Sequence, residues 1–313
     1  MAKIKKISTA GMSKADWVSL RSGTIGGSDA ASILGMNPYK SAYALWAEKI
    51  GEIEPEDISG KESVRLGTDL EEYVARRFTE ATGKKVRREN YTVFRKDMPF
   101  AHANYDRLLI GEKAGLECKT TNALHLSKFK GGEYPATYYC QCMHYLMVSG
   151  LERWYLAVLV LGIGFYVYVI ERDEDEIAAL EQAERRFWDM VQRRQRPDTD
   201  GSESTLDTLR AEFPEDNGGE MDLTGYAGDL AILEACGRQK KEITAKENAA
   251  KARIMAAMGE KEKGSYGGYR VSWKTQHRKD FDRTAFEKDR GSIPAIYFKD
   301  NPNRVFRFRK EKT

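Results

Sequence analysis

Residues 101–121 constrain the fold more than any other stretch of this 313-residue chain. Their sequence, AHANYDRLLIGEKAGLECKTT, predicts two strands, 101–110 and 116–121, joined by a turn over the Gly-Glu-Lys-Ala-Gly of 111–115. A hairpin of this kind places the end of its first strand beside the start of its second strand. The side chains at that point are the first candidates for a functional site.

Three charged side chains meet there if the strands pair. Side chains alternate along a strand, so Glu117 and Lys119 share one face, and Asp106 lies on the neighbouring strand. Two carboxylates beside an ammonium group can bind a hard divalent cation and polarise a water molecule. The same three residues also suit an exposed hairpin with ordinary cross-strand charge pairs. Signals from elsewhere in the chain must distinguish these two hypotheses.

Composition indicates a soluble globular protein of the cytoplasm. Charged residues make up 32% of the chain and hydrophobic residues 41%, and the formal charge of +3 is too small to indicate nucleic-acid binding. The longest apolar run, 154–170, is broken by Gly162 and Gly164, which predicts two buried strands and no membrane span. The first seventeen residues lack the apolar core of a signal peptide. The four cysteines have neither CxxC nor secreted-framework spacing, which predicts reduced thiols.

A glycine-rich turn near the N-terminus is a candidate anion site. The segment GTIGGSDAASILG follows a short predicted helix over 13–21, and Ser28 or Asp29 would cap a second helix that ends near Gly35. Free N–H groups at such a helix start favour phosphate, to which Arg21 and the Ser28 hydroxyl could add donors. The alternative is a well-capped helix after a flexible turn.

Two further helices carry polar groups on otherwise apolar sides. The predicted helix 62–82 has an apolar stripe at helical spacing, flanked by Glu71, which therefore faces inward or toward a rim. The stripe consists of Leu66, Leu70, Val74 and Phe78. The predicted helix 138–149 carries Gln141 on its apolar side, as a core amide or as a polar group in a cleft. An inward glutamate needs a metal or a basic partner, and a salt bridge is the commoner case.

The order of the elements predicts an α/β fold with a central mixed sheet flanked by helices. Strands are expected at 85–95, 153–160 and 164–171 in addition to the hairpin, with an amphipathic helix over 173–194. This first domain would cover residues 1–195.

The C-terminal third is predicted to be a separate α+β accessory domain. The polar stretch 196–220 is the expected linker, and 221–313 would hold a long helix followed by strands at 269–274 and 304–309. Residues 260–313 hold fifteen Lys or Arg against eight Asp or Glu. A basic ribbon with Trp273, Tyr297 and Phe298 could contact nucleic acid or an acidic partner, and an ordinary solvated arginine face explains it equally well.

The combined motifs resemble a known nuclease superfamily. Gly67-x-x-x-Glu71, Asp106, Glu117-x-Lys119 and Gln141 occur in the order of the PD-(D/E)XK nucleases. The segment RSGTIGGSDAASILGMNPYKSAYALWAEKIG, with FYVYVIERDEDEI and RRFWDMV downstream, resembles the YqaJ-like viral recombinases, relatives of phage lambda exonuclease. The resemblance covers roughly residues 17–195 and implies a restriction-endonuclease-like core.

The resemblance implies roles for individual residues. Asp106 and Glu117 would be ligands of catalytic Mg²⁺, together with the Cys118 backbone carbonyl, and Glu71 would contact a second ion, with Mn²⁺ able to substitute. Lys119 would orient the attacking water.

Four residues would then bind the substrate: Arg21, Ser28, Asn104 and Gln141. Arg21 and Ser28 match the pocket for a 5′-terminal phosphate, Asn104 stands where relatives can have a small hydroxyl residue, and Gln141 would contact a DNA phosphate and support the lysine. Tyr105-Asp106-Arg107 departs from the Pro-Asp-Gly that relatives often show, which puts the turn geometry after Asp106 in question.

The implied function is a Mg²⁺-dependent 5′→3′ double-strand DNA exonuclease of phage-type recombination. It would release 5′-mononucleotides and leave 3′ overhangs for a phage single-strand annealing protein, as a ring-shaped homotrimer in the bacterial host cytosol. The alternatives are an endonuclease on the same core and a non-catalytic DNA- or partner-binding protein. An iron–sulfur nuclease is disfavoured by the spacing of the cysteines.

Overall fold

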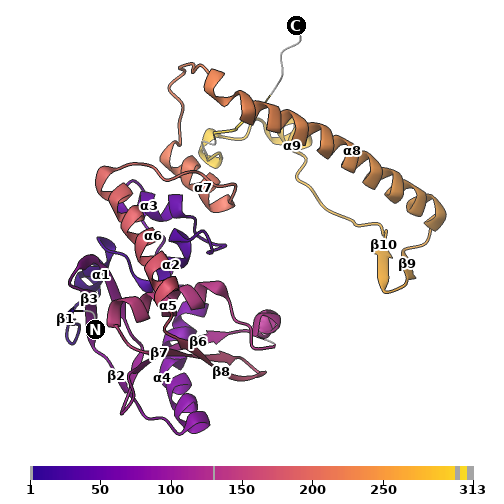
Figure 1. The fold of residues 1–313 in the computed structure, drawn as a ribbon. Coiled ribbons are helices and arrows are strands. Elements are labelled where there is room, and N and C mark those ends of the chain that lie inside the picture. The colour runs from indigo at the N-terminus through magenta and orange to yellow at the C-terminus, as the bar shows by residue number, and fades with distance from the viewer. Residues whose placement is uncertain (1–2, 130, 300–303, 309–313) are drawn as a thin grey trace. The chain divides into compact units, whose positions relative to one another are not determined.

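The chain folds into two compact units, Met1–Phe213 and Pro214–Thr313 (Figure 1). The structure, a computed structural model, describes residues 3–129, 131–299 and 304–308. Among these residues, no helix combines the length and the apolar character needed to cross a membrane. The first unit is a mixed α/β fold with a central mixed sheet flanked by helices, and the second is a small α+β region.

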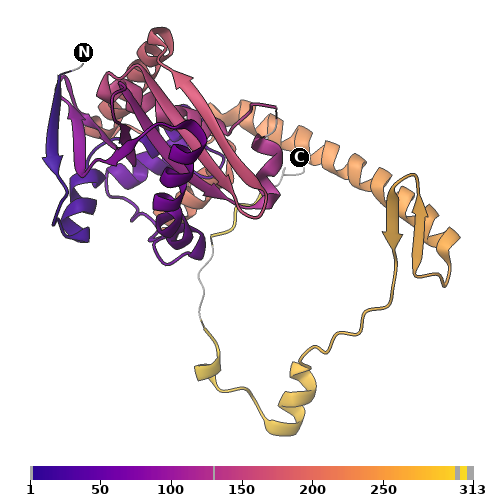
Figure 2. The same ribbon diagram turned by 90° about the horizontal axis from the view of Figure 1, so that it is seen from below.

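The central sheet has five strands in the order β2-β5-β6-β7-β8 (Figures 1 and 2). Strands β6 and β7 run parallel, and the other pairs are antiparallel. The bounds are β2 (Val86–Arg88), β5 (Arg107–Leu109), β6 (Ala114–Thr121), β7 (Arg153–Val160) and β8 (Gly164–Glu171). Strand β7 is apolar and almost wholly buried, as a strand covered on both faces should be.

A second sheet of three strands runs in the order β1-β3-β4. Its strands are β1 (Ile4–Ser8), β3 (Tyr91–Arg95) and β4 (Met98–Asn104). The expected strand over 101–110 is therefore wrong as a single element, because β4 ends at Asn104 and only 107–109 pairs with β6. The chain changes sheets at Tyr105 and Asp106.

Helices cover both faces of the central sheet. On one face lies α4 (Glu62–Thr82), whose predicted apolar stripe is confirmed, with Val74 and Phe78 fully buried against β6 and β7. On the other face lies α5 (Ala136–Ser149), which packs against α2 and α6. The remaining helices of this unit are α1 (Lys14–Ser22), α2 (Gly27–Ile33), α3 (Ala42–Lys49), η1 (Ala123–Phe129), α6 (Glu174–Arg193) and α7 (Glu203–Glu212).

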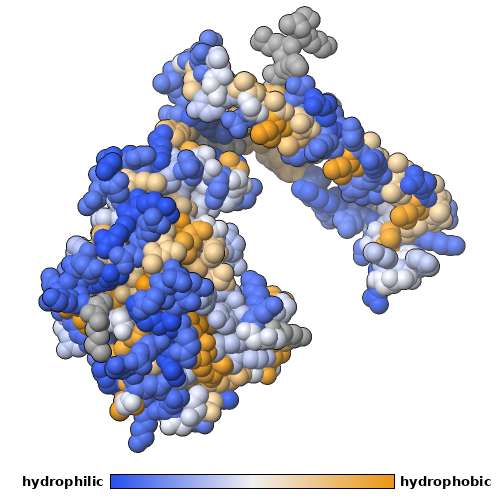
Figure 3. Space-filling model, viewed as in Figure 1, coloured by the Kyte–Doolittle hydropathy of each residue, from blue (hydrophilic) through white to orange (hydrophobic). Residues whose placement is uncertain are grey.

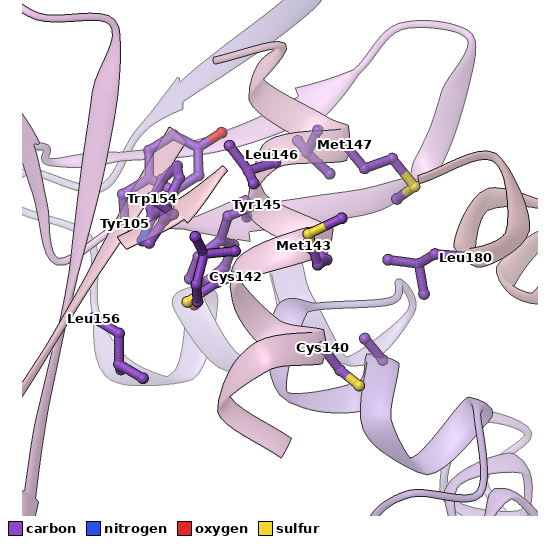
Figure 4. Close-up of a cluster of buried hydrophobic side chains, with 14 of the residues drawn as sticks. Tyr105, Cys140, Cys142, Met143, Tyr145, Leu146, Met147, Trp154, Leu156 and Leu180 are labelled. Atoms are coloured by element: carbon purple, nitrogen blue, oxygen red, sulfur yellow. The ribbon is translucent and has the colours of Figure 1, made fainter. Parts of the chain in front are cut away.

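An aromatic cluster fixes the point where the chain changes sheets. The rings of Tyr105 and Trp154 lie 5.0 Å apart between centroids, and both contact Tyr145 of α5 (Figure 4). Gly115 of β6 makes room for this cluster, because a Cβ there would lie 2.2 Å from the Trp154 ring. Packing at this density leaves Tyr105 no alternative position, so the next residue, Asp106, is also held in place.

The expected linker over 196–220 is in part a folded segment. Helix α7 packs on α3, the Ser204 hydroxyl accepts the backbone N–H of Ser41 at 3.0 Å, and Tyr43 donates to Glu212 at 2.6 Å. Its N-cap, Ser202, accepts from Thr205, which is the usual start signal of a helix. The boundary between the two units falls at 213/214, after this helix.

The second unit lacks a buried core among its described residues. It contains η2 (Thr224–Tyr226), α8 (Ala227–Met258), the hairpin β9 (Lys263–Tyr266) and β10 (Tyr269–Ser272), α9 (Arg283–Arg290) and η3 (Ala295–Tyr297). Hydrophobic side chains interrupt the polar surface of the long helix in the space-filling view (Figure 3). The strand expected at 304–309 is wrong over 304–308, which have no pairing partner, and Arg309 lies outside the described residues.

Candidate active site

Asp106 and Glu117 converge between the two sheets, as the sequence predicts. Asp106 follows the anchored Tyr105, and its Oδ2 accepts the backbone N–H of Cys118 at 2.7 Å. Cys118 lies between Glu117 and Lys119 on β6, so the Asp106 carboxylate lies against the backbone that carries both side chains. The change of sheet at 105–106 thus creates the site, because it turns the acid toward β6.

Lys119 and Gln141 close the site from the side of α5. Lys119 Nζ lies 2.6 Å from Glu117 Oε1 and donates to Gln141 Oε1 at 3.0 Å. Gln141 Nε2 donates to Glu117 Oε1 at 2.7 Å and lies 2.8 Å from the Tyr145 hydroxyl. Both predicted features of Gln141 are present, since it is a hydrogen-bonded amide and also lines a cavity. We call Asp106, Glu117, Lys119 and Gln141 the carboxylate cluster.

Burial shapes the charges of this cluster. Burial and the nearby Glu117 carboxylate raise the pKa of Asp106 well above its usual range, against the opposing effect of Lys119. Burial alone would lower the pKa of Lys119, but Glu117 and Asp106 raise it overall, so the lysine stays an ammonium. Two carboxylates therefore lie beside one base, with Glu117 buried and Asp106 and Lys119 partly buried, and the raised pKa of Asp106 reflects the cost of placing both negative charges here.

The cluster fits a divalent cation. Oε2 of Glu117 is buried and has no hydrogen-bond partner, which is a costly arrangement for a carboxylate oxygen. Oxygen ligands and excess negative charge are what Mg²⁺ selects. Across the described ranges, no group of three or more His, Cys, Asp and Glu side chains is arranged to hold a metal. Other ligands would have to be backbone oxygens, such as the carbonyl predicted at Cys118, or water.

Glu71 lies beside the cluster but is engaged elsewhere. It forms an ion pair with Arg107 and lies 3.7 Å from Arg88, so it has basic partners and does not face Asp106 as a free ligand. Arg107 is the residue that sequence reasoning missed. Its side chain is 3% exposed, donates to the Asp106 carbonyl at 2.6 Å and bridges to α4. The signal was available, because Arg107 occupies the position where relatives often have glycine.

Arg21 and Asn104 form a second group of polar side chains. Arg21, at the end of α1, stacks on the Trp17 ring at 4.0 Å, and its Nε donates to His102 Nε2 at 3.3 Å. Asn104, two residues beyond His102 on β4, accepts from Thr92, but its Nδ2 is buried without a partner. Burial lowers the pKa of Arg21. Unpartnered donors of this kind suit an anion.

Ser28 lines a cavity that also contains Gln141 of the carboxylate cluster. The cavity has a volume of about 550 Å³ and is lined by Ser28 of α2, Gln141 of α5 and the rings of Tyr39 and Tyr138. Ser28 is exposed to it. We call Arg21, Ser28 and Asn104, the three residues predicted to bind a DNA end, the end pocket.

A single glycine allows α2 to approach α5. A Cβ on Gly27 would lie 2.6 Å from the Tyr145 ring and 3.1 Å from Cγ of Gln141. Contacts this short are excluded for real side chains, so glycine is required for the helices to pack as they do. The start of α2 is held by Asp29, which accepts the Gly26 N–H at 3.0 Å and pairs with Lys49 at 2.9 Å. Of the two hypotheses for this turn, the capped helix is confirmed, and anion binding stays a prediction.

The sequence matches a described family over the whole site. Residues 16–152 match the family described as "YqaJ-like viral recombinase domain", a range that contains every predicted site residue. The chain is 36% identical over 305 residues to the uncharacterized protein YqaJ of Bacillus subtilis (strain 168), covering 95% of this chain and 93% of that protein.

The fold resembles solved alkaline exonuclease structures. The alkaline exonuclease LHK-Exo of Laribacter hongkongensis is 19% identical, with a TM-score of 0.50 over 58% of this chain and 94% of that chain. Its complex with dAMP matches to the same extent. The likeness shows that the first unit shares the fold of these structures, and the expected central mixed sheet flanked by helices is confirmed.

Proposed function

Because the chain belongs to the YqaJ-like viral recombinase family, we propose that it is a Mg²⁺-dependent exonuclease that digests double-stranded DNA from its 5′ ends. The observation that carries this proposal is the convergence of Asp106, Glu117 and Lys119, with Oε2 of Glu117 buried and unpartnered. Two acids and a lysine, one of the acids with an unpartnered carboxylate oxygen, are suited to metal-assisted phosphodiester hydrolysis. The structural neighbour LHK-Exo is an alkaline exonuclease, which agrees with this chemistry.

The residues of the carboxylate cluster divide the work of hydrolysis. Mg²⁺ bound by Asp106 and Glu117 would supply Lewis-acid stabilisation of the phosphate and lower the pKa of a water molecule. Lys119, held as an ammonium, orients that water and stabilises negative charge as the phosphorus is attacked. Gln141 accepts the 3.0 Å hydrogen bond from Lys119 and so fixes the position of the positively charged ammonium group.

The end pocket accounts for the direction of digestion. Arg21, Ser28 and Asn104 offer a guanidinium, an exposed hydroxyl and an unpartnered amide N–H. A 5′-terminal phosphate carries up to two negative charges over three oxygens, whereas an internal phosphodiester carries one, and such donors can distinguish the two. Repeated removal of 5′-mononucleotides would leave 3′ single strands, which a phage single-strand annealing protein could bind. A ring-shaped trimer around the duplex would keep the enzyme on its substrate.

Glu71 has two possible roles in this proposal. Its pairing with Arg107 and Arg88 supports a role in fixing the turn after Asp106. The role as ligand of a second Mg²⁺ requires that the carboxylate leave Arg107 when the ion binds. Glu71→Gln distinguishes them, because a ligand role predicts a higher Mg²⁺ requirement, whereas a turn-fixing role predicts lower thermal stability with an unchanged Mg²⁺ requirement.

A linear duplex with separately labelled 5′ and 3′ ends tests the proposed function. We expect loss of the 5′ label first, as a mononucleotide, only with Mg²⁺ or Mn²⁺ present, and no cleavage of a covalently closed circle. Cleavage of the circle would identify an endonuclease on the same core. Binding without any cleavage would identify a DNA-binding protein.

A further inference from the structure

His102 is a buried histidine that the proposed chemistry does not use. It lies on β4, and its side chain is enclosed, with an overall exposure of 2%. Nδ1 is 2.8 Å from the Thr24 hydroxyl and Nε2 is 3.3 Å from Nε of Arg21. Both partners belong to the turn and helix that carry the end pocket, so the imidazole connects β4 to that pocket.

The hydrogen bonds assign the proton on the ring. Thr24 donates its hydroxyl hydrogen to the Arg21 carbonyl at 3.1 Å, so its oxygen is left to accept from Nδ1–H of His102. Nε2 then carries the lone pair that accepts from Nε–H of Arg21. One neutral tautomer satisfies all three contacts, and an imidazolium would direct an N–H at the guanidinium.

The surroundings keep this ring neutral. Burial, the guanidinium of Arg21 and the nearby His144 lower the pKa of His102 to about 3, and Lys49 acts in the same direction. Asp29 of α2 acts in the opposite direction with a smaller effect. His102 is therefore a permanent hydrogen-bond acceptor for Arg21 at any pH at which the enzyme would be assayed.

Arg21 is held at one end and available at the other. The Trp17 ring covers a face of the guanidinium at 4.0 Å, and His102 occupies Nε. Within the described ranges, the two terminal nitrogens have no hydrogen-bond partner. These nitrogens form the planar fork that binds phosphate oxygens in pairs.

Backbone contacts hold the acceptor in place. His102 N–H donates to the Ile25 carbonyl at 2.9 Å, and Ile25 N–H donates to Phe100 at 2.6 Å, so the turn before α2 is bound to β4. On the other side, His144 Nε2 lies 2.8 Å from the His102 carbonyl, and Nδ1 lies 2.7 Å from Glu184. The backbone of His102 is therefore held rigidly, so its imidazole can orient the Arg21 side chain.

We propose that His102 is a positioning residue for end recognition, which accepts from Nε of Arg21 and so directs the terminal nitrogens of that guanidinium to the 5′-phosphate. This inference rests on the proposed function. It predicts that the accepting atom at the Nε2 position, and not the volume of the ring, determines the preference for phosphorylated ends.

Two substitutions at position 102 separate these possibilities. In His102→Gln the side-chain oxygen reaches the Nε2 position and keeps an acceptor for Arg21, whereas His102→Asn reaches only as far as Nδ1 and keeps the Thr24 contact. The readout is the ratio of initial rates on 5′-phosphoryl and 5′-hydroxyl duplexes, with KM and kcat determined separately. Since both rates come from one preparation, the ratio does not depend on its folded fraction. His277→Asn, at an exposed position of the second unit, is the matched control.

We expect the ratio to fall about tenfold in His102→Asn, the size of one hydrogen bond to a charged group, mainly through KM. His102→Gln should keep most of the wild-type ratio, and His277→Asn all of it. A wild-type ratio in His102→Asn would overturn the role of His102 alone, and an equal loss in both variants would show a packing effect instead. A wild-type enzyme that does not distinguish the two duplexes would overturn the end pocket itself, and this inference with it.

Discussion

The carboxylate cluster has an unpaired acceptor and more acids than bases, whereas the end pocket has unpaired hydrogen-bond donors. In the carboxylate cluster, Glu117, Lys119 and Gln141 contact one another within 3.0 Å, but two carboxylates lie beside a single base. In the end pocket, Arg21 and Asn104 have donors without acceptors. One group needs a cation and the other an anion. A DNA end with a bound metal ion would supply both, which is the substrate complex that the proposed function requires.

The largest effect should follow removal of charge from the carboxylate cluster. Asp106→Ala or Lys119→Ala should lower the rate of digestion at least about 100-fold, because each removes transition-state stabilisation. DNA binding in Ca²⁺ should be retained, since the end pocket is untouched. Rates on end-labelled duplex, with binding measured separately, check this. Wild-type activity in either variant would show that the site is elsewhere.

Loss of Arg21 should have a smaller and more selective effect. Arg21→Ala should slow digestion of phosphorylated ends about 10- to 100-fold, as expected for charged hydrogen bonds, and leave the rate on 5′-hydroxyl ends nearly unchanged. Competition between the two substrates in one tube measures this selectivity. An equal slowing on both substrates would make Arg21 a general DNA contact and would remove the distinction between the two groups.

Cation binding should remove the charge imbalance. The pKa of Asp106 is raised in the folded protein, so folded Asp106 binds a proton more tightly than Asp106 in the unfolded chain. Without metal, the free energy of unfolding should therefore fall as the pH rises through that raised pKa. Ca²⁺ or Mg²⁺ at 100 times its dissociation constant should add about 2.7 kcal/mol. Thermal unfolding at pH 5 and pH 8, with EDTA or with cation, tests both statements. Asp106→Asn should reduce both effects.

The contact between α2 and α5 can be disrupted with one methyl group. Gly27→Ala should destabilise the first unit by about 1–3 kcal/mol, as overpacking does, and should lower activity by displacing Gln141. Gly23→Ala is the matched control, since a Cβ there meets no atom within 4 Å. Equal melting temperatures for the two variants would mean that the helices can separate without cost.

The smallest effect should come from the largest deletion. Removing 214–313 should leave the rate on short phosphorylated duplexes close to that of the full chain, because the described buried core lies entirely in the first unit. A melting curve verifies that the shortened chain is folded. Loss of activity in a folded truncation would give the second unit a part in the chemistry.

The elements with strong periodicity could be predicted from the sequence. The α4 stripe and the strands β7 and β8 are formed as expected from local spacing, but only β7 is buried as predicted, because β8 lies at the edge of the sheet and buries only Ile170. The strand predicted over 304–309 has the same kind of alternation but no partner strand in 304–308. Alternation indicates which face a strand would bury, but a strand also needs a partner strand, and the local sequence does not identify that partner.

The residues of the carboxylate cluster could be predicted from the sequence, but the backbone break and the side-chain contacts around them could not. Asp106, Glu117, Lys119 and Gln141 come together, yet the break between β4 and β5 has no glycine or proline to mark it. The pairing of Glu71 with Arg107 spans thirty-six residues and depends on packing that no local window contains. His102 could equally well have been an ordinary core histidine until its two partners were located.

Strand β4 has a further consequence for the product of the reaction. It anchors the turn of the end pocket at Phe100 and His102, and four residues after His102 the same chain presents Asp106. Only Ala103, Asn104 and Tyr105 lie between the two points, and the rings of Tyr145 and Trp154 hold Tyr105 in place. If the DNA end is bound at the end pocket and cut at Asp106, the length of this backbone segment determines how many nucleotides are released in each step. A single residue inserted into β4 would turn the following side chains to the opposite face of the strand, so both the spacing and the orientation of Asp106 would change.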